Sequence, residues 1–192
     1  MTSFPATPEA LRGRYPAELE RAWQPSGGAA LLLRPLRADD RERERAFIES
    51  LSAQTLYLRL QYSANSASER DLARLLDLDY YDRFAIAAIA MESGDERIVG
   101  VSRYARIDDS RRAECAIVVA DAWQGRGLGS ELMRALVMAA AERDIDCLEG
   151  TTLAENGRIA EWARRFGFAV RTQPNSGGLL LVQLDLRNLA PT

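Results

Sequence analysis

The chain of 192 residues contains no histidine. This absence excludes Ser-His-Asp and Cys-His nucleophilic triads and all histidine-based metal sites. Any general base must therefore come from the remaining titratable side chains or from water. The two cysteines, Cys115 and Cys147, lack the C-x-x-C spacing of zinc or redox motifs, so we predict no metal site and a reduced, cytoplasmic protein.

Long apolar runs and a strong charge of one sign are also missing. Apolar residues make up 47% of the chain and charged residues 28%, but no run approaches the ~20 residues that a membrane helix needs. The N-terminus lacks the pattern of a signal peptide. A formal net charge of −3 offers no basic field for nucleic acid. We therefore expect neither a membrane nor a nucleic acid among the partners.

Proline and glycine divide the chain into two parts. Residues 1–28 hold four of the seven prolines and end in Ser26-Gly27-Gly28. This composition predicts an N-terminal arm with a short helix between Pro16 and Trp23. Residues 29–188 contain no low-complexity linker, and their length suits one domain with a full core.

The hydrophobic pattern of residues 29–188 changes between helical and strand periods. Helices are expected from Asp39-Asp40 to Leu51, from an N-cap at Ser52 to Leu60, after Ser66-Ala67-Ser68-Glu69, and after residues 127 and 155. Strands are expected at residues 30–36, 84–90, 97–107, 112–120, 147–153, 169–171 and 179–186. This order of elements predicts an α/β domain with a mixed sheet.

The most informative segment is the glycine-rich turn from Gln124 to Gly129. It follows the apolar, β-branched run Ala116–Ala120 and precedes a helix with Leu128, Leu132 and Leu136 on one side. A turn between a strand and a helix directs free backbone N–H groups and a positive helix end at a bound anion. Glycine lets the backbone approach a phosphate closely. The segment therefore predicts a site for a phosphorylated ligand.

The glycine spacing separates this turn from the commoner phosphate loops. A Rossmann G-x-G-x-x-G fails because Ser130 or Leu132 stands where the third glycine is needed, and a Walker A loop fails because no Lys-Ser or Lys-Thr follows. The pattern Q/R-x-x-G-x-G/A remains, with Gln124, Gly127 and Gly129. It resembles the acetyl-CoA pyrophosphate loop of the GNAT superfamily of N-acetyltransferases. The alternative interpretation is an ordinary strand-to-helix turn.

Other segments extend this resemblance over residues 31–186. Asn156, the helix that follows it and Gly167-Phe168 are similar in order to a second GNAT motif. More closely, the chain resembles the acetyltransferase domain of bacterial Pat-type protein lysine acetyltransferases. The matching segments are Leu33–Arg37, Asp39-Asp40, Leu51–Arg59, Asp79–Arg83, Ile98–Val101, Ala113-Glu114 and Trp123–Gly129.

The resemblance implies a GNAT fold with acetyl-CoA as acyl donor. In that fold a mixed, mostly antiparallel sheet of six to seven strands has helices on both faces and one parallel strand pair that splays apart. The pantetheine would lie along the main chain of Ile117, Val118 and Val119. The implied phosphate-binding loop comprises Gln124, Gly125, Arg126, Gly127, Leu128, Gly129 and Ser130. Asn156 would either contact the pantetheine or cap its own helix, and Arg158 would face the phosphates.

Glu114 is the candidate general base. It lies at the start of the strand before the phosphate loop, at the Ala113-Glu114 position of the Pat-like pattern. Strand alternation puts its side chain on the face of Ala116 and Val118. The alternative is a solvated glutamate that pairs with Arg111 or Arg112.

One position departs from the resemblance. Many GNAT enzymes with small-molecule substrates have a tyrosine four residues before Gly-Phe as general acid, and Ala163 stands there in this chain. Tyr57, Tyr80, Tyr81 and Tyr104 are candidates to replace it, with packing as the alternative role for each.

The acceptor implied by the Pat-like pattern is a protein lysine, with acyl-CoA synthetases as typical protein partners. Asp79 and Asp82 would attract its ammonium group, or else belong to a solvated turn. A small-molecule amine acetyltransferase and a non-catalytic acyl-CoA-binding sensor are the two alternative functions. A monomer and a homodimer both fit the sequence.

Overall fold

The computed structural model describes residues 8–25, 28–60, 68–173 and 176–187. These residues form one eight-stranded sheet in the order β1-β2-β3-β4-β5-β6-β8-β7. All neighbouring strands are antiparallel except β5 and β6, which are parallel. The strands are β1 (Arg21–Trp23), β2 (Leu31–Pro35), β3 (Arg83–Glu92), β4 (Asp95–Arg106), β5 (Arg112–Val119), β6 (Cys147–Leu153), β7 (Ala169–Thr172) and β8 (Leu179–Asp185). The helices are α1 (Pro8–Leu11), α2 (Arg41–Ser50), α3 (Ala53–Leu60), α4 (Glu69–Leu76), α5 (Leu128–Ala141) and α6 (Gly157–Phe166), with short 3₁₀ segments η1 (Ala17–Leu19), η2 (Ala38–Asp40) and η3 (Asp121–Trp123).

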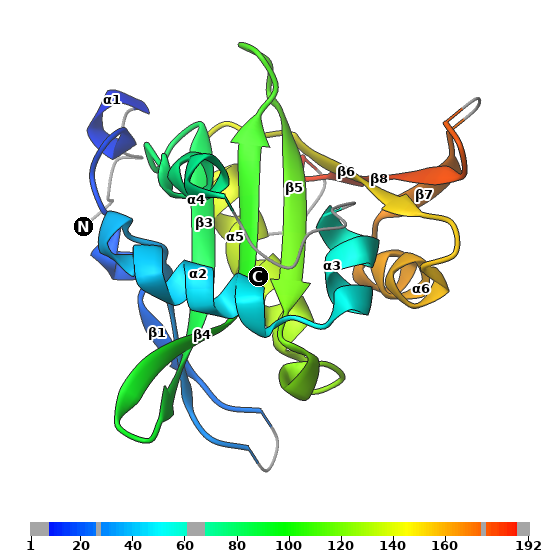
Figure 1. Cartoon of the computed structure of the whole chain (residues 1–192). Helices are drawn as coiled ribbons and strands as arrows, with labels where there is room; N and C mark the ends of the chain where they lie inside the picture. Colours follow the sequence, from blue (N-terminus) through cyan, green and yellow to red (C-terminus); the bar gives the residue numbers. More distant parts are fainter. Residues whose placement is uncertain (1–7, 26–27, 61–67, 174–175, 188–192) are drawn as a thin grey trace.

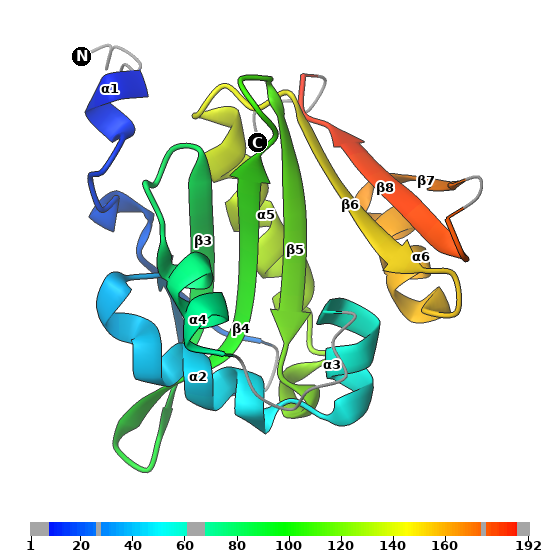
Figure 2. The ribbon, with the colours of Figure 1, turned by 45° about the horizontal axis from the view of Figure 1, so that its top comes forward.

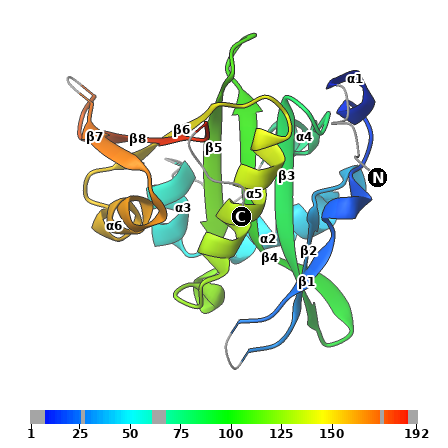
Figure 3. The same ribbon diagram turned by 180° about the vertical axis from the view of Figure 1, so that it is seen from behind.

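Helices cover both faces of the sheet. Figure 1 shows α2, α3 and α4 on one face, and Figure 3 shows α5 crossing the other face over β3, β4 and β5. The alternation of apolar side chains along β3 explains this arrangement. Ala85, Ala87 and Ile89 belong to the core under α2, whereas Phe84 and Ile86 belong to the core under α5. β3 is therefore buried on both sides.

The predicted fold class is confirmed, with one strand more than expected. The additional strand is β1, which comes from the predicted arm and pairs with β2 between Arg21 and Leu33. The predicted helix between Pro16 and Trp23 is wrong, because only residues 17–19 form a single 3₁₀ turn. Pairing with the sheet edge gives the backbone of Arg21–Trp23 its hydrogen bonds and overrides the local helical pattern. The division at residue 28 stays a prediction.

The two helices α3 and α4, which lie on the same face of the sheet as α2, each begin after a serine that caps the helix. The N–H of Thr55 donates to Ser52 Oγ at 3.2 Å, as expected from the sequence. The N-cap of α4 is Ser68, which accepts a hydrogen bond from the N–H of Asp71. Ser66, where the sequence pattern begins, lies outside the described residues.

None of the helices in the described ranges has the length and apolar character that crossing a membrane requires.

A buried ion pair fixes the corner between β2 and α2. Arg34 and Asp40 are both completely buried. The guanidinium donates two hydrogen bonds to the carboxylate, at 2.6 and 2.7 Å. The backbone N–H of Arg37 adds a third at 2.9 Å. This pair anchors the start of α2, which covers the sheet next to the candidate site.

The parallel pair β5–β6 opens along its length. The two strands pair only between Arg112–Glu114 and Cys147–Glu149, although β5 continues to Val119 and β6 to Leu153. A Cβ on Gly150 would lie 2.8 Å from the Cys115 carbonyl oxygen, so only glycine fits where the strands begin to part. Figure 2 shows the strands side by side at their start and apart at their arrowheads, with α3 at the open end. The expected splayed pair is therefore present.

Candidate active site

A cavity of about 40 Å³ lies in the gap between β5 and β6. Residues of β5 and β6 form one wall of the cavity, and residues of α5, α6 and β8 form the opposite wall. The lining residues are Cys115, Ala116, Ile117, Met133, Gly150, Thr151, Thr152, Ile159, Trp162, Ala163, Phe168 and Val182. Most of these side chains are apolar, so the lining disfavours a charged group.

The glycine-rich turn stands at the end of this gap. Gly125 and Gly127 adopt left-handed backbone conformations, with φ of +75° and +85°. Gly127 is the N-cap of α5, and no side chain caps the helix there. The first N–H groups of a 14-residue helix therefore point out of its N-terminal end, where they and the helix dipole favour an anion. This geometry fits the pyrophosphate of a coenzyme A molecule.

Gln124 connects the turn to its surroundings. Its amide nitrogen donates to the Val119 carbonyl oxygen at 3.0 Å, and its amide oxygen accepts from Arg158 at 3.3 Å. Asp121, just before the turn, accepts hydrogen bonds from the Ser52 N–H at 3.0 Å and the Thr55 hydroxyl at 2.8 Å. The turn is thus fixed to α3 on one side and α6 on the other.

The predicted arm also supports the turn. Arg21 of β1 forms an ion pair at 2.6 Å with Glu131 in the first turn of α5. A Cβ on Gly127 would lie 4.0 Å from the Trp23 ring, so the indole stands behind the glycine. Sequence reasoning did not connect the arm with the loop, because only sheet pairing brings β1 to this end of α5.

Two arginines flank the turn. The Arg126 guanidinium stacks 5.4 Å from the Trp123 ring centroid, and Arg158 Nη2 would lie 3.6 Å from a Cβ on Gly125. Both positive charges therefore lie at the glycine-rich turn. Asn156 accepts a hydrogen bond from the Ile159 N–H at 3.3 Å, so its capping role is present. Its contact with pantetheine stays a prediction.

Glu114 lies beside the point where the strands part, and its side chain is exposed. Cys115 and Ile117 pack toward α5 and Val118 toward the α2 face, which confirms the predicted alternation. Arg111 binds Asp146, with an N–O distance of 2.7 Å, and Arg112 binds Glu149. The alternative pairing of Glu114 with either arginine is therefore wrong. The Glu114 carboxylate has no ion-pair or hydrogen-bond partner among the described residues.

A second carboxylate stands next to Glu114. Glu149 is its register partner on β6, so both side chains project from the same face of the sheet. Glu149 accepts hydrogen bonds from Arg112 and, at 3.1 Å, from Gln183. Burial raises the pKa of Glu149, but these hydrogen bonds outweigh it and the pKa lies below its ordinary value. The sequence analysis missed Glu149. A glutamate inside an otherwise neutral strand was its only signal.

The tyrosines proposed to replace the acid at Ala163 lie elsewhere. Ala163 itself lines the cavity. The Tyr104 hydroxyl donates to the Tyr81 carbonyl oxygen at 2.8 Å, and the Tyr80 hydroxyl donates to the Leu36 carbonyl oxygen at 3.2 Å. Tyr57 is exposed on α3, where a hydrogen bond with Glu155 raises the pKa of its hydroxyl. These four side chains are not among the cavity lining.

Asp79 and Asp82 belong to a turn that arginines neutralise. Asp79 accepts hydrogen bonds from three backbone N–H groups, at residues 81–83. Both carboxylates bind Arg12, at 3.1 and 2.6 Å, and Asp82 also binds Arg106 at 2.7 Å. These contacts favour the structural role of the turn over attraction of a lysine ammonium group.

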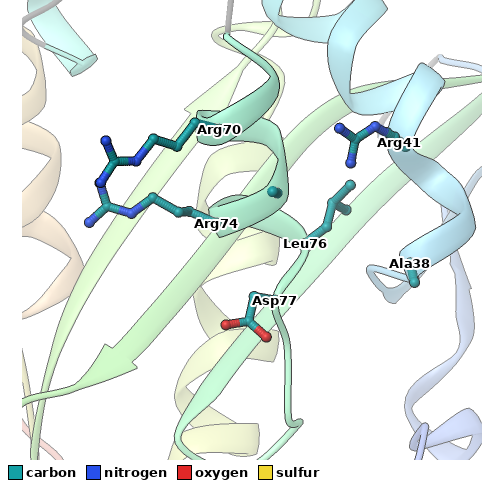
Figure 4. Close-up of a pocket in the computed structure, with 7 residues that line it drawn as sticks. Ala38, Arg41, Arg70, Arg74, Leu76 and Asp77 are labelled. Atoms are coloured by element: carbon teal, nitrogen blue, oxygen red, sulfur yellow. The ribbon is translucent and has the colours of Figure 1, made fainter.

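A larger hollow of about 510 Å³ lies between α2 and α4, away from the parallel pair. Figure 4 shows Arg70 and Arg74 extending from the same side of α4, with Arg41 on the facing helix. Arg41 pairs with Glu69, and Asp77 pairs with Arg83 at 3.0 Å. None of the residues predicted to bind the acyl donor lines this hollow. The hollow is therefore separate from the predicted donor site.

Comparison with known proteins agrees with this geometry. The model of the acetyltransferase (GNAT) family matches residues 50–168. Acetyltransferase PA5475 of Pseudomonas aeruginosa is 36% identical over 159 residues, which cover 83% of this chain and 86% of that protein. Acetyltransferase Pat of Mycolicibacterium smegmatis is 30% identical over 160 residues, covering 83% of this chain and 46% of Pat. The match thus spans less than half the length of Pat.

The fold similarity extends over nearly the whole chain. The crystal structure of the GNAT domain of PAT from S. lividans superposes with a TM-score of 0.81 and 28% sequence identity. The superposition covers 90% of this chain and 99% of that domain. The fold of this chain therefore matches that of a GNAT domain over most of its length.

Proposed function

Since the chain belongs to the GNAT acetyltransferase family, we propose that it acetylates a lysine side chain of a protein, with Glu114 as general base. The donor is acetyl-CoA, as in the family. The observation that carries the proposal is an exposed carboxylate, at the point where β5 and β6 separate, that has no ion-pair partner in the part of the chain that the structure describes. We further propose that the protein acts in the cytoplasm on an acyl-CoA synthetase.

The donor is proposed to lie in the gap between the parallel strands. The N–H groups from Arg126 to Ser130 would bind the pyrophosphate, with Arg158 beside it. The main chain of Ile117–Val119 has no β6 partner and would pair with the pantetheine amides, as an added strand would. Each charge-assisted hydrogen bond to phosphate would contribute about 1.5–3 kcal/mol.

The reaction requires a neutral amine. A free lysine side chain has a pKa of about 10.4, so it is almost wholly protonated near neutral pH. Glu114 takes one proton from the ammonium, directly or through water. The nitrogen then bonds to the acetyl carbon, the C–S bond breaks, and its electron pair leaves on sulfur. The second proton leaves the nitrogen as the amide forms and ends on the thiolate.

A cationic acceptor suits the charges around Glu114. Glu149 stands beside it as a second carboxylate whose charge Arg112 only partly balances in an exposed ion pair. The chain itself offers no competing acceptor side chain, because all 25 of its basic residues are arginine. Thiol release in an assay therefore reports acetylation of the added acceptor and not of the enzyme's own side chains.

The acceptor class is tested by comparing lysine peptides with small amines and amino-acid derivatives, following thiol release from acetyl-CoA. We expect release with a subset of lysine peptides, including peptides from acyl-CoA synthetases. Release only with small amines would assign the chain to the small-molecule enzymes. Binding of CoA without release from any acceptor would favour a sensor and would contradict the proposal.

The phosphate loop is tested by Gly127→Val. We expect CoA affinity to fall by more than tenfold, because a side chain would cover the N–H groups that bind the pyrophosphate. Gly94→Val is the matched control. Gly94 also has a positive φ, +92°, but lies in the β3–β4 turn far from the loop. Calorimetric titration with CoA separates loss of binding from backbone strain. Equal CoA affinity in both variants and the wild type would contradict the loop assignment.

A further inference from the structure

Thr152 carries a buried hydroxyl that the fold does not use. The residue is 5% exposed and lines the cavity between β5 and β6. Its Oγ1 has no hydrogen-bond partner among the described residues. A buried hydroxyl without a partner destabilises a folded protein, and most such groups in proteins are hydrogen-bonded. Its place in the cavity wall therefore points to a ligand atom as its partner.

Thr151, the other lining residue with a hydroxyl, alternates with Thr152 along β6, and its side chain is exposed rather than buried. Met133, Phe168 and Val182 line the cavity with apolar atoms. The indole N–H of Trp162 donates to Ser130 Oγ at 3.0 Å and is already engaged. Thr152 thus supplies a buried oxygen donor in a mostly apolar cavity.

The position of Thr152 relative to Ala163 gives the hydroxyl a specific role. Both residues line the same cavity, on the α6 side of the gap. Glu114 lies on the opposite face of β5, toward α2. Glu114 and the Thr152 hydroxyl thus lie on opposite faces of the sheet. At residue 163 helix α6 contributes only a methyl group to the cavity wall.

We propose that the Thr152 hydroxyl donates a hydrogen bond to the sulfur of the acyl donor as the C–S bond breaks. This inference rests on the proposed function, since it requires acetyl-CoA in the gap. The electron pair of the C–S bond moves to sulfur, and the hydrogen bond from Thr152 stabilises the thiolate. No proton leaves Thr152. The proton released from the amide nitrogen later converts the thiolate to the thiol.

The first test compares turnover of Thr152→Val, Thr152→Ser and wild type with saturating acetyl-CoA and an accepted amine. Valine keeps the shape and removes the hydroxyl, so we expect kcat to fall about ten- to a hundredfold. Serine keeps the hydroxyl and is expected to restore at least a third of wild-type kcat. Thr172→Val, on the exposed strand β7, is the matched control and should leave kcat unchanged. Equal kcat in T152V and wild type would overturn the inference.

The second test asks whether the hydroxyl reaches sulfur. CoA and desulfo-CoA differ only in that atom. We expect T152V to weaken CoA binding by about two- to tenfold and to leave desulfo-CoA binding unchanged. T152V should also be at least as resistant to thermal unfolding as wild type, because valine removes an unpaired buried group. Equal weakening for both ligands, or a lowered Tm, would show a packing role and overturn the inference. Wild-type protein that binds neither ligand would instead refute the proposed function.

Discussion

Glu114→Gln is expected to lower turnover by about 10² to 10⁴-fold, the contribution of a positioned general base. Glutamine keeps the size of the side chain but cannot take a proton from the ammonium group. The loss should appear in kcat with acetyl-CoA saturating. CoA affinity measured by calorimetry should stay near the wild-type value, because the phosphate loop lies at the other end of β5.

Two variants make this result specific. Glu92→Gln replaces an exposed strand glutamate at the far end of the β3–β4 hairpin, and we expect unchanged turnover. Glu149→Gln changes the neighbouring carboxylate, which Arg112 and Gln183 already engage. It should reduce turnover less than E114Q does. A larger loss in E149Q would transfer the role of base to Glu149, and undiminished turnover in E114Q would reject Glu114.

Asp40→Ala is expected to destabilise the folded protein by about 3–5 kcal/mol, because the buried, charged Arg34 guanidinium loses both hydrogen bonds to the carboxylate and keeps only the more distant Glu96, at 3.9 Å, as a charged partner in the described chain. Both side chains of the pair are fully buried. For a chain of this size, such a loss lowers Tm by about 6–20 °C. Thermal and denaturant unfolding measure it. Asp146→Asn, which removes a carboxylate from an exposed pair with Arg111, is the control and should change Tm little.

Acid should remove the same contribution in the wild type. Burial alone would raise the pKa of Asp40, but the hydrogen bonds from Arg34 and from the Arg37 N–H lower it below its ordinary value. A carboxyl with a lowered pKa in the folded state contributes stability above its unfolded pKa of about 3.9, and this is lost as the pH falls toward the folded value. D40A should therefore lose less stability than wild type below about pH 4.

The double variant R34M/D40L tests the origin of the effect. Replacing both charges by apolar side chains removes the unpaired charge, so we expect it to recover most of the stability that D40A loses. If D40A were as stable as wild type, or the double variant less stable than D40A, the pair would not anchor α2 as described.

The glycine turn and the strand pattern could be predicted because their causes are local. Gly125 and Gly127 stand where the backbone has positive φ, and the helix after them follows directly from the spacing of Leu128, Leu132 and Leu136. Alternation along β5 was predictable in the same way, since it needs only the two-residue period of a strand.

Other features were not predictable because their partners are distant in sequence. Arg112 is two residues from Glu114 but binds Glu149, and this contact depends on the parallel register of β5 and β6. Arg34 and Asp40 lie in segments that match the Pat-like pattern, yet nothing in the local sequence indicates that both side chains are buried. The prediction of a short helix in the arm was wrong for the same reason, because Arg21–Trp23 form an edge strand that gains hydrogen bonds from β2.

The order of helices and strands predicted an α/β domain with a mixed sheet, the glycine turn predicted a phosphate site, and the lack of histidine excluded a histidine base. Those properties depend on spacing, backbone freedom and side-chain chemistry within short segments. Tertiary structure alone decided which charges are neutralised and which hydroxyl is buried. In the described chain the Glu114 carboxylate has no ion-pair partner and the Thr152 hydroxyl has no hydrogen-bond partner. Both results follow from the register and separation of β5 and β6, whose paired residues lie more than thirty positions apart in the sequence.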